Sequence, residues 1–233
     1  MVKSDLKKVL EKIYNKFNPR SIFIYGSQVN GDTNLRSDYE VGVIFDEENY
    51  ISRSTLKDQI ATQKISIYPF KYNELLQYKI DTPFEKNIYI FNLINGGAKT
   101  IFGENIIENM VSPKINKIDL IKDTCFNLGV ALSAVQVNKE NNTNLAHQLM
   151  YKSFFYSLRN LLFLKTGTII NGYNNIYKAG QKLNLPEEYL ILIETCHKLR
   201  NESADKINQT LFFKNISFIN KYVLELIEKD RLD

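Results

Sequence analysis

Two acidic side chains on one predicted strand form the pattern in this sequence that could carry chemistry. Asp38 and Glu40 lie two residues apart at the start of an apolar stretch that runs to Phe45. Because alternate residues of a strand point to the same side, the two carboxylates should share one face. Hard cations such as Mg²⁺ bind oxygen ligands of this kind and take further ligands from substrate phosphates. The spacing therefore predicts a magnesium site with Asp38 and Glu40 as metal ligands.

A Gly-Ser pair precedes the carboxylates and directly follows a short apolar strand predicted over Ser21–Tyr25. Gly26 allows a sharp turn and a close approach of the backbone to a phosphate. Ser27 offers a hydroxyl and an N–H donor at the expected start of a short helix, where anions are favoured. Gly42 lies on the carboxylate face of its strand and is expected to leave room for a ligand. Together these features predict a site that binds a metal ion and a substrate phosphate.

Three basic residues are further candidates for contacts with phosphate. Arg36 and Lys64 lie close to the two strands that are expected to form the site, and Lys152 lies on a helix in the second half of the chain. For each of them the alternative interpretation is an ordinary solvated surface charge. Asp46 shares the strand face of the acidic pair but lies at the far end of the strand, so we expect it to be solvated.

The first half of the chain mixes strand and helix patterns, which predicts an α+β domain. A first helix begins at Ser4 or Asp5 and ends before Pro19, because its apolar residues recur at helical spacing. Strands are predicted at 21–25, 39–45, 63–70 and 99–102, and helices at 52–62, 73–79 and 83–94. The last of these helices is expected to have Pro83 in its first turn, where proline is favourable, and to end at Gly96-Gly97.

The second half shows helix patterns only and predicts an all-α helical bundle. One long helix is expected to bury the stripe Ile121, Cys125, Leu128, Leu132 and Val135. After a loop over 138–144, a second helix at 145–164 carries the stripe Tyr151, Phe154, Leu158 and Leu161. Further helices are predicted at 176–183, 187–200 and 215–227. The change of pattern near Pro113 divides the chain into a domain at 1–112 and a domain at 113–233.

The composition is that of a globular protein, with 233 residues, 44% hydrophobic residues, 24% charged residues and a net charge of +4. This charge permits an anionic substrate and does not indicate a nucleic-acid partner. The two cysteines, Cys125 and Cys196, lie in apolar helical patterns and are expected to be buried free thiols in a reducing compartment. No apolar run is long enough for a membrane span. We therefore expect a cytoplasmic protein.

The order of strand, Gly26-Ser27, polar spacer, Ser37-Asp38-Tyr39-Glu40 and apolar strand resembles the signature of the nucleotidyltransferase superfamily, which has a polymerase-beta-like fold. The two-domain layout is similar to that of the aminoglycoside nucleotidyltransferases, including those that modify kanamycin. This resemblance implies Mg²⁺-dependent attack of a small-molecule hydroxyl on the α-phosphorus of a nucleoside triphosphate. It also implies that Gly26 and Ser27 hold the β- and γ-phosphates. Dimers are frequent among such relatives, which makes a homodimer an open expectation.

The sequence departs from that family in two places. Active members usually carry a third carboxylate on the next strand, where this chain has Ser66, and the segment 127–135 lacks the acid that serves as a base in the kanamycin-modifying enzymes. Alternative functions therefore stay open. One is a degenerate nucleotidyltransferase fold that binds a nucleotide or a protein partner without catalysis. Another is a toxin–antitoxin type modifier of protein or tRNA.

Overall fold

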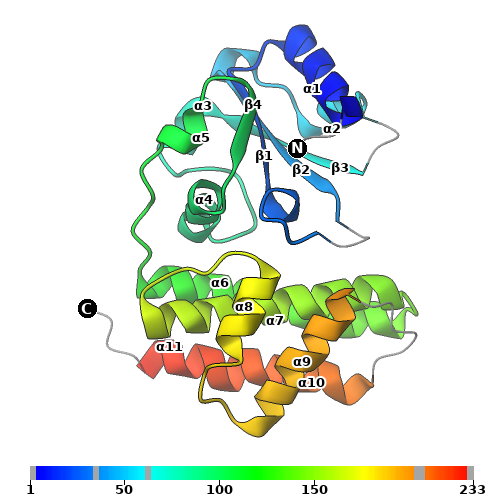
Figure 1. The fold of residues 1–233 in the computed structure, drawn as a ribbon, viewed down its shortest axis with the longest axis vertical. Helices are drawn as coiled ribbons and strands as arrows, with labels where there is room; N and C mark the ends of the chain where they lie inside the picture. Colours follow the sequence, from blue (N-terminus) through cyan, green and yellow to red (C-terminus); the bar gives the residue numbers. More distant parts are fainter. Residues whose placement is uncertain (1–3, 34–36, 61–63, 202–207, 230–233) are drawn as a thin grey trace. The chain divides into compact units, whose positions relative to one another are not determined.

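The computed structural model divides the chain into two compact units (Figure 1). The first unit comprises Met1–Lys114 and the second Ile115–Asp233, whereas the sequence pattern placed the boundary after residue 112. The residues described by the structure are 4–33, 37–60, 64–201 and 208–229. The predicted fold class is confirmed, because unit 1 is a mixed α/β unit built on one sheet and unit 2 is helical.

A four-stranded sheet in the order β3-β2-β1-β4 forms the centre of unit 1. The strands are β1 (Ser21–Tyr25), β2 (Tyr39–Phe45), β3 (Ile65–Lys71) and β4 (Lys99–Gly103). β1 runs antiparallel to both β2 and β4, while β2 and β3 are parallel. The bounds of β1 and β2 agree with the predicted ones. β3 lies at an edge of the sheet next to the carboxylate strand.

Both faces of the sheet are covered by helices. The helices of unit 1 are α1 (Ser4–Phe17), α2 (Arg53–Lys57), α3 (Tyr72–Leu76), α4 (Lys86–Asn95) and α5 (Ile106–Asn109), with 3-10 turns η1 (Gly26–Gln28) and η2 (Glu47–Asn49). On one face Leu10 of α1 and Leu56 of α2 pack against Val41 and Val43 of β2. On the other face Leu93 of α4 joins Phe23 and Ile44 in a second core cluster. Alternation along β1 and β2 thus supplies two apolar surfaces.

Two helices of unit 1 differ from their predicted bounds. α2 ends at Lys57, although the pattern predicted a helix to Thr62; Ala61 and Thr62 lie outside the described residues. The prediction that Pro83 lies in the first turn of its helix is wrong. The carboxylate of Glu85 accepts a hydrogen bond from the backbone N–H of Ile88 at 2.8 Å and so caps α4, which begins only at Lys86.

Unit 2 consists of two long antiparallel helices and a set of shorter ones (Figure 1). They are α6 (Lys117–Lys139), α7 (Thr143–Thr166), α8 (Tyr173–Gly180), α9 (Glu187–Asn201), α10 (Gln209–Ser217), the π-helical turn η3 (Phe218–Leu224) and α11 (Glu225–Lys229). The connection of α6 to α7 is shorter than the predicted loop because both helices extend into it. α7 ends at Gly167, as predicted, with φ of 67° in the left-handed region. The single helix predicted at 215–227 is interrupted by η3.

The buried face of α6 is not the predicted stripe but the neighbouring side of the helix. Leu132 is 54% exposed and Cys125 is exposed, so the apolar stripe does not face the core of unit 2 and the prediction of a buried Cys125 is wrong. The buried face carries Asp123, Thr124 and Asn127 instead. Cys196 is fully buried, and this burial raises the pKa of its thiol, which keeps it protonated.

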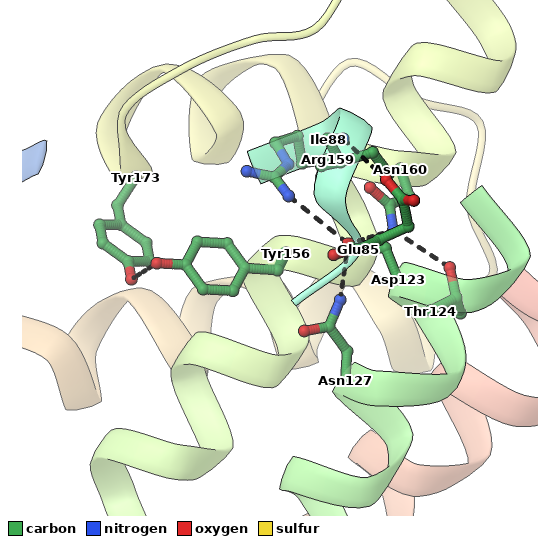
Figure 2. A network of polar contacts seen from close by, with 9 residues as sticks. All are labelled: Glu85, Ile88, Asp123, Thr124, Asn127, Tyr156, Arg159, Asn160 and Tyr173. Carbon is green, nitrogen blue, oxygen red and sulfur yellow. Dashed lines mark hydrogen bonds and ion pairs between the residues drawn. The ribbon is translucent and has the colours of Figure 1, made fainter. Parts of the chain in front are cut away.

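A polar network between α6 and α7 explains why this side of α6 is buried (Figure 2). Oδ2 of Asp123 accepts hydrogen bonds from Nδ2 of Asn160 at 2.8 Å and from Nδ2 of Asn127 at 3.1 Å. A terminal nitrogen of Arg159 lies 3.5 Å from the same oxygen, and Nδ2 of Asn160 also donates to Thr124 at 3.1 Å. Buried polar groups are tolerated when they are paired in this way.

Within the described parts of the chain, no helix is long and apolar enough to cross a membrane.

Candidate functional site

The C-terminal end of β1 and the N-terminal ends of β2 and β3 meet at one edge of the sheet. Tyr25 is paired with Glu40 across the antiparallel strands β1 and β2. On the other side, Glu40 is paired with Ser66 in the parallel register of β2 and β3. Glu40 therefore lies between the last residue of β1 and the start of β3, and Asp38 precedes β2 at the same edge.

Ser66 makes direct contact with one of the two carboxylates. Its hydroxyl donates a hydrogen bond to Oδ2 of Asp38. Both residues are only partly buried, so the carboxylate edge remains accessible to solvent. Asp38 is thus oriented by a neutral donor on the neighbouring strand rather than repelled by a third negative charge.

Gly26 lies directly against the other carboxylate. It has φ of 76°, which L-residues with a side chain rarely adopt, and a Cβ atom at this position would stand 1.8 Å from Oε2 of Glu40. The carbonyl oxygen of Gly26 accepts hydrogen bonds from the N–H groups of Val29 and Asn30 at 3.1 and 3.2 Å, which closes the tight turn η1. The turn therefore requires glycine both for its backbone conformation and for the position of Glu40. Ser27 is the second residue of η1.

The space predicted above Gly42 does not exist. Gly42 is buried, and a Cβ atom there would lie 2.0 Å from the ring of Phe23, its cross-strand partner. The missing side chain thus makes room for an aromatic ring of the core rather than for a ligand. This prediction was wrong because the residue opposite Gly42 could be identified only once the strand register was known.

Residues 7–96 match the family model described as Polymerase beta, Nucleotidyltransferase. The matched residues lie within unit 1, which has a nucleotidyltransferase-like fold. The structure is also similar to that of spectinomycin adenyltransferase AAD(9) from Enterococcus faecialis, solved with ATP and spectinomycin. The TM-score is 0.64 at 16% sequence identity, and the match covers 94% of this chain and 98% of that one, so it shows a shared fold. A comparison with curated proteins finds no match.

Three tyrosines lie near Glu40 in unit 1. The hydroxyl of Tyr25 lies 3.1 Å from that of Tyr89 on α4, and the rings of Tyr25 and Tyr68 are 6.4 Å apart. Burial raises the pKa of Tyr25 well above its ordinary value, and the negative charge of Glu40 raises it further. Burial and Glu40 also raise the pKa of Tyr89, against the opposing effect of the positive charge on Arg53. These hydroxyls therefore stay protonated, and one of them donates its hydrogen bond to the other.

Tyr89 and Arg53 were not recognised from the sequence. Both lie on predicted helices in which nothing distinguished them from surface residues. In the structure, Nε of Arg53 donates to the carbonyl oxygen of Ile67 at 3.0 Å, and its guanidinium carbon lies 4.1 Å from the ring centre of Tyr68. The strand order would have been needed to find this contact, because it joins α2 to the open edge of β3.

The structure describes two of the three basic residues predicted to contact phosphate. Arg36 lies outside the described residues. Lys64 is exposed immediately before β3, and its carbonyl oxygen accepts a hydrogen bond from the N–H of Tyr39 at 2.8 Å, which holds it beside the carboxylate strand. Lys152 is an exposed residue of α7 in unit 2. Asp46 is exposed and lies 3.4 Å from Arg20.

Asp38 and Glu40 are the acidic groups available to a metal at this edge. Across the residues that the structure describes, no group of three or more His, Cys, Asp or Glu side chains could hold a metal ion. Two neighbouring carboxylates nevertheless suit Mg²⁺, which keeps several waters and is commonly bound by one or two carboxylates together with substrate phosphates. The donor set therefore fits a cation that arrives with a triphosphate better than a permanently bound one.

Proposed function

We propose that this protein transfers a nucleoside monophosphate from a nucleoside triphosphate to a hydroxyl group of a small molecule in a Mg²⁺-dependent reaction. The observation that supports this most directly is the contact of Glu40 with Gly26, next to Asp38. It brings a carboxylate pair and a tight glycine turn together at one edge of a nucleotidyltransferase domain.

Each residue of this edge has a defined part in the proposed reaction. Asp38 and Glu40 would hold Mg²⁺, which supplies charge neutralisation for the triphosphate and alignment of its reacting oxygens. Gly26 and Ser27 bind the β- and γ-phosphates through the turn η1. Arg36, Lys64 and Lys152 stay predicted phosphate contacts. Ser66 holds the carboxylate of Asp38 in place through its hydrogen bond.

The acceptor suggested by the structural similarity is an aminoglycoside-like antibiotic, since the similar enzyme was solved with spectinomycin. We include a cytoplasmic location in the proposal, because nucleoside triphosphates are abundant there, and a homodimer as the predicted assembly. Pyrophosphate release from ATP and Mg²⁺, measured with a panel of hydroxyl compounds that includes spectinomycin, tests the reaction. We expect release that depends on both Mg²⁺ and an acceptor.

A nucleotide-binding protein without catalysis is the second candidate. It is favoured by the neutral Ser66 beside Asp38 and by the lack of an acid in the segment 127–135. Saturable binding of ATP without pyrophosphate release from any acceptor would favour this candidate. Turnover with a protein or tRNA acceptor, and with no small molecule, would support a macromolecular modifier instead.

The substitution Ser66→Asp tests whether the site is built for a cation. It adds a third carboxylate beside Asp38 and Glu40, and repulsion should lower the free energy of unfolding in EDTA by roughly 1 kcal/mol or more. Excess MgCl₂ should recover this loss, so the melting temperature of the variant should rise more with Mg²⁺ than that of the wild type. Ser66→Asn, which is similar in size and uncharged, is the control. An equal response of both variants to Mg²⁺ would contradict a cation site at this edge.

The substitution Gly26→Ala tests the contact between the turn and Glu40. The methyl group must displace the carboxylate, so Mg²⁺-dependent transfer should fall by about 10- to 100-fold. The positive φ should also cost about 1–2 kcal/mol of stability. Gly167→Ala is a matched control, since it has φ of 67° and nothing within 4 Å of the added Cβ. Urea unfolding and pyrophosphate release should show a similar stability loss in both variants and an activity loss only in Gly26→Ala.

A further inference from the structure

Arg53 is held firmly for an exposed arginine. Its Nε donates a hydrogen bond to the carbonyl oxygen of Ile67, and its guanidinium carbon lies 4.1 Å from the ring centre of Tyr68. Such fixation removes rotamer entropy of the arginine side chain in advance of binding. Among the described residues, no carboxylate forms an ion pair with it. The two terminal nitrogens are therefore a preorganised, positively charged fork.

This fork lies beside the carboxylate face of the sheet. Tyr68 follows Ser66 by two residues on β3, so both point to the face that carries Glu40. Ser66 contacts Asp38, and the ring of Tyr68 lies 6.4 Å from that of Tyr25, the cross-strand partner of Glu40. The effect of Arg53 on the pKa of Tyr89, which also responds to Glu40, is consistent with this placement.

The strand order places the turn η1 and Arg53 on opposite sides of the carboxylate strand β2. η1 follows β1 on one side of the carboxylate strand β2, whereas Arg53 lies at the open edge of β3 on the other side. In an in-line transfer, the attacking oxygen approaches the α-phosphorus from the side opposite to the leaving pyrophosphate. If Gly26 and Ser27 hold the leaving phosphates, as proposed above, the acceptor approaches from the β3 side.

We propose that Arg53 recognises a carboxylate or phosphate group on the hydroxyl acceptor. The proposal rests on the proposed function and specifies its acceptor class. The planar fork matches two oxygens of an oxyanion, which selects an anionic hydroxyl compound among small-molecule acceptors in place of the aminoglycoside-like one suggested by the structural similarity. In the reaction, the acceptor oxygen forms a bond to the α-phosphorus, the bond from that phosphorus to the leaving oxygen breaks, and pyrophosphate and the hydroxyl proton leave.

The test compares matched acceptors of known charge. Glycerol, glycerate and glycerol 3-phosphate are offered with ATP and Mg²⁺, and pyrophosphate release is measured for the wild type, Arg53→Lys and Arg53→Gln. We expect kcat/KM for at least one anionic acceptor to exceed that for glycerol about 10-fold or more, and Arg53→Gln to remove this preference. Arg53→Lys, which keeps the charge without the fork, should retain part of it. Preference for glycerate or for the phosphate distinguishes the two oxyanions.

Binding of the acceptor compounds is measured as well, so that the proposal can be judged even if turnover is slow. Ligand-observed NMR follows the same three compounds with a non-hydrolysable ATP analogue and Mg²⁺. Arg53-dependent binding of an anionic compound supports the proposal, and its absence overturns it. Weaker ATP binding by Arg53→Gln would assign Arg53 to the donor nucleotide, which overturns the acceptor assignment and leaves the transferase function standing. If the wild type did not bind ATP at all, the result would instead contradict the transferase function.

Arg20→Gln is the matched control. Arg20 also stacks on a tyrosine, with its guanidinium carbon 3.8 Å from the ring centre of Tyr72. Its nitrogens are engaged by Asp46 at 3.4 Å and by Glu104 at 3.3 Å, and it precedes β1 at the opposite end of that strand from Gly26. Its substitution should leave the preference between acceptors unchanged. A loss of preference equal to that of Arg53→Gln would overturn the proposal.

Discussion

Replacement of Asp38 by alanine should abolish Mg²⁺-dependent nucleotide transfer while the protein stays folded. Asp38 is one of only two carboxylates that the described edge offers to a cation, because Ser66 is neutral. Loss of a metal ligand that stabilises charge in the transition state is expected to lower the rate by about 10²- to 10³-fold. Isothermal titration calorimetry with Mg²⁺ and ATP should show correspondingly weaker binding.

Asp46→Ala provides the control for this experiment. Asp46 shares a strand face with Asp38 but lies beyond the other end of β2, exposed and 3.4 Å from Arg20. Exposed ion pairs of this kind contribute about 1 kcal/mol or less, so this variant should keep full activity and nearly full stability. Equal binding of Mg²⁺ and ATP by the wild type and Asp38→Ala would contradict the proposed function.

Replacement of Asp123 by alanine should strongly destabilise unit 2. The substitution removes the acceptor of three contacts and leaves the charge of Arg159 buried, with 9% of its side chain exposed. Breaking a buried ion pair by removing one partner costs about 3–5 kcal/mol. Urea denaturation followed by circular dichroism should therefore show an early transition of the helical unit.

Two further variants identify the origin of this loss. Lys122→Ala changes an exposed neighbour on the same helix and should alter the unfolding free energy by about 0.5 kcal/mol or less. The double variant Asp123→Leu with Arg159→Met replaces the pair by apolar side chains and should recover much of the stability. A double variant as unstable as Asp123→Ala would show that the cost does not come from the orphaned charge.

The strands of unit 1 were predictable because local signals coincide there. β1 is buried over its whole length and is bounded by Pro19 and Gly26, while Asp38 and Glu40 flank the first residue of β2, which ends at an acidic turn. Gly26 and Glu40 could be predicted to share one site because both lie close to these strand ends in the sequence. Their direct contact could not be predicted, since it depends on the register of β1 against β2.

Predictions that depended on partners from elsewhere in the chain were less successful. The stripe Ile121 to Val135 is more apolar than the side of α6 that is buried, so hydrophobic periodicity selected the wrong side. The polar side is buried because α7 presents Arg159 and Asn160 to Asp123. Gly42 was misread because Phe23 fills its space from the neighbouring strand.

The amino-acid sequence alone determined the division into a mixed unit and a helical unit, and the short segment in which a glycine turn precedes two carboxylates. These features depend on periodicity and on residues close together in the chain, which can be read without coordinates. Only the tertiary structure decided which side of α6 is buried, that Glu40 rests on Gly26, and that Arg53 reaches the carboxylate face. Each of these depends on strand register or helix packing between distant residues, where the pairing of groups outweighs local preference.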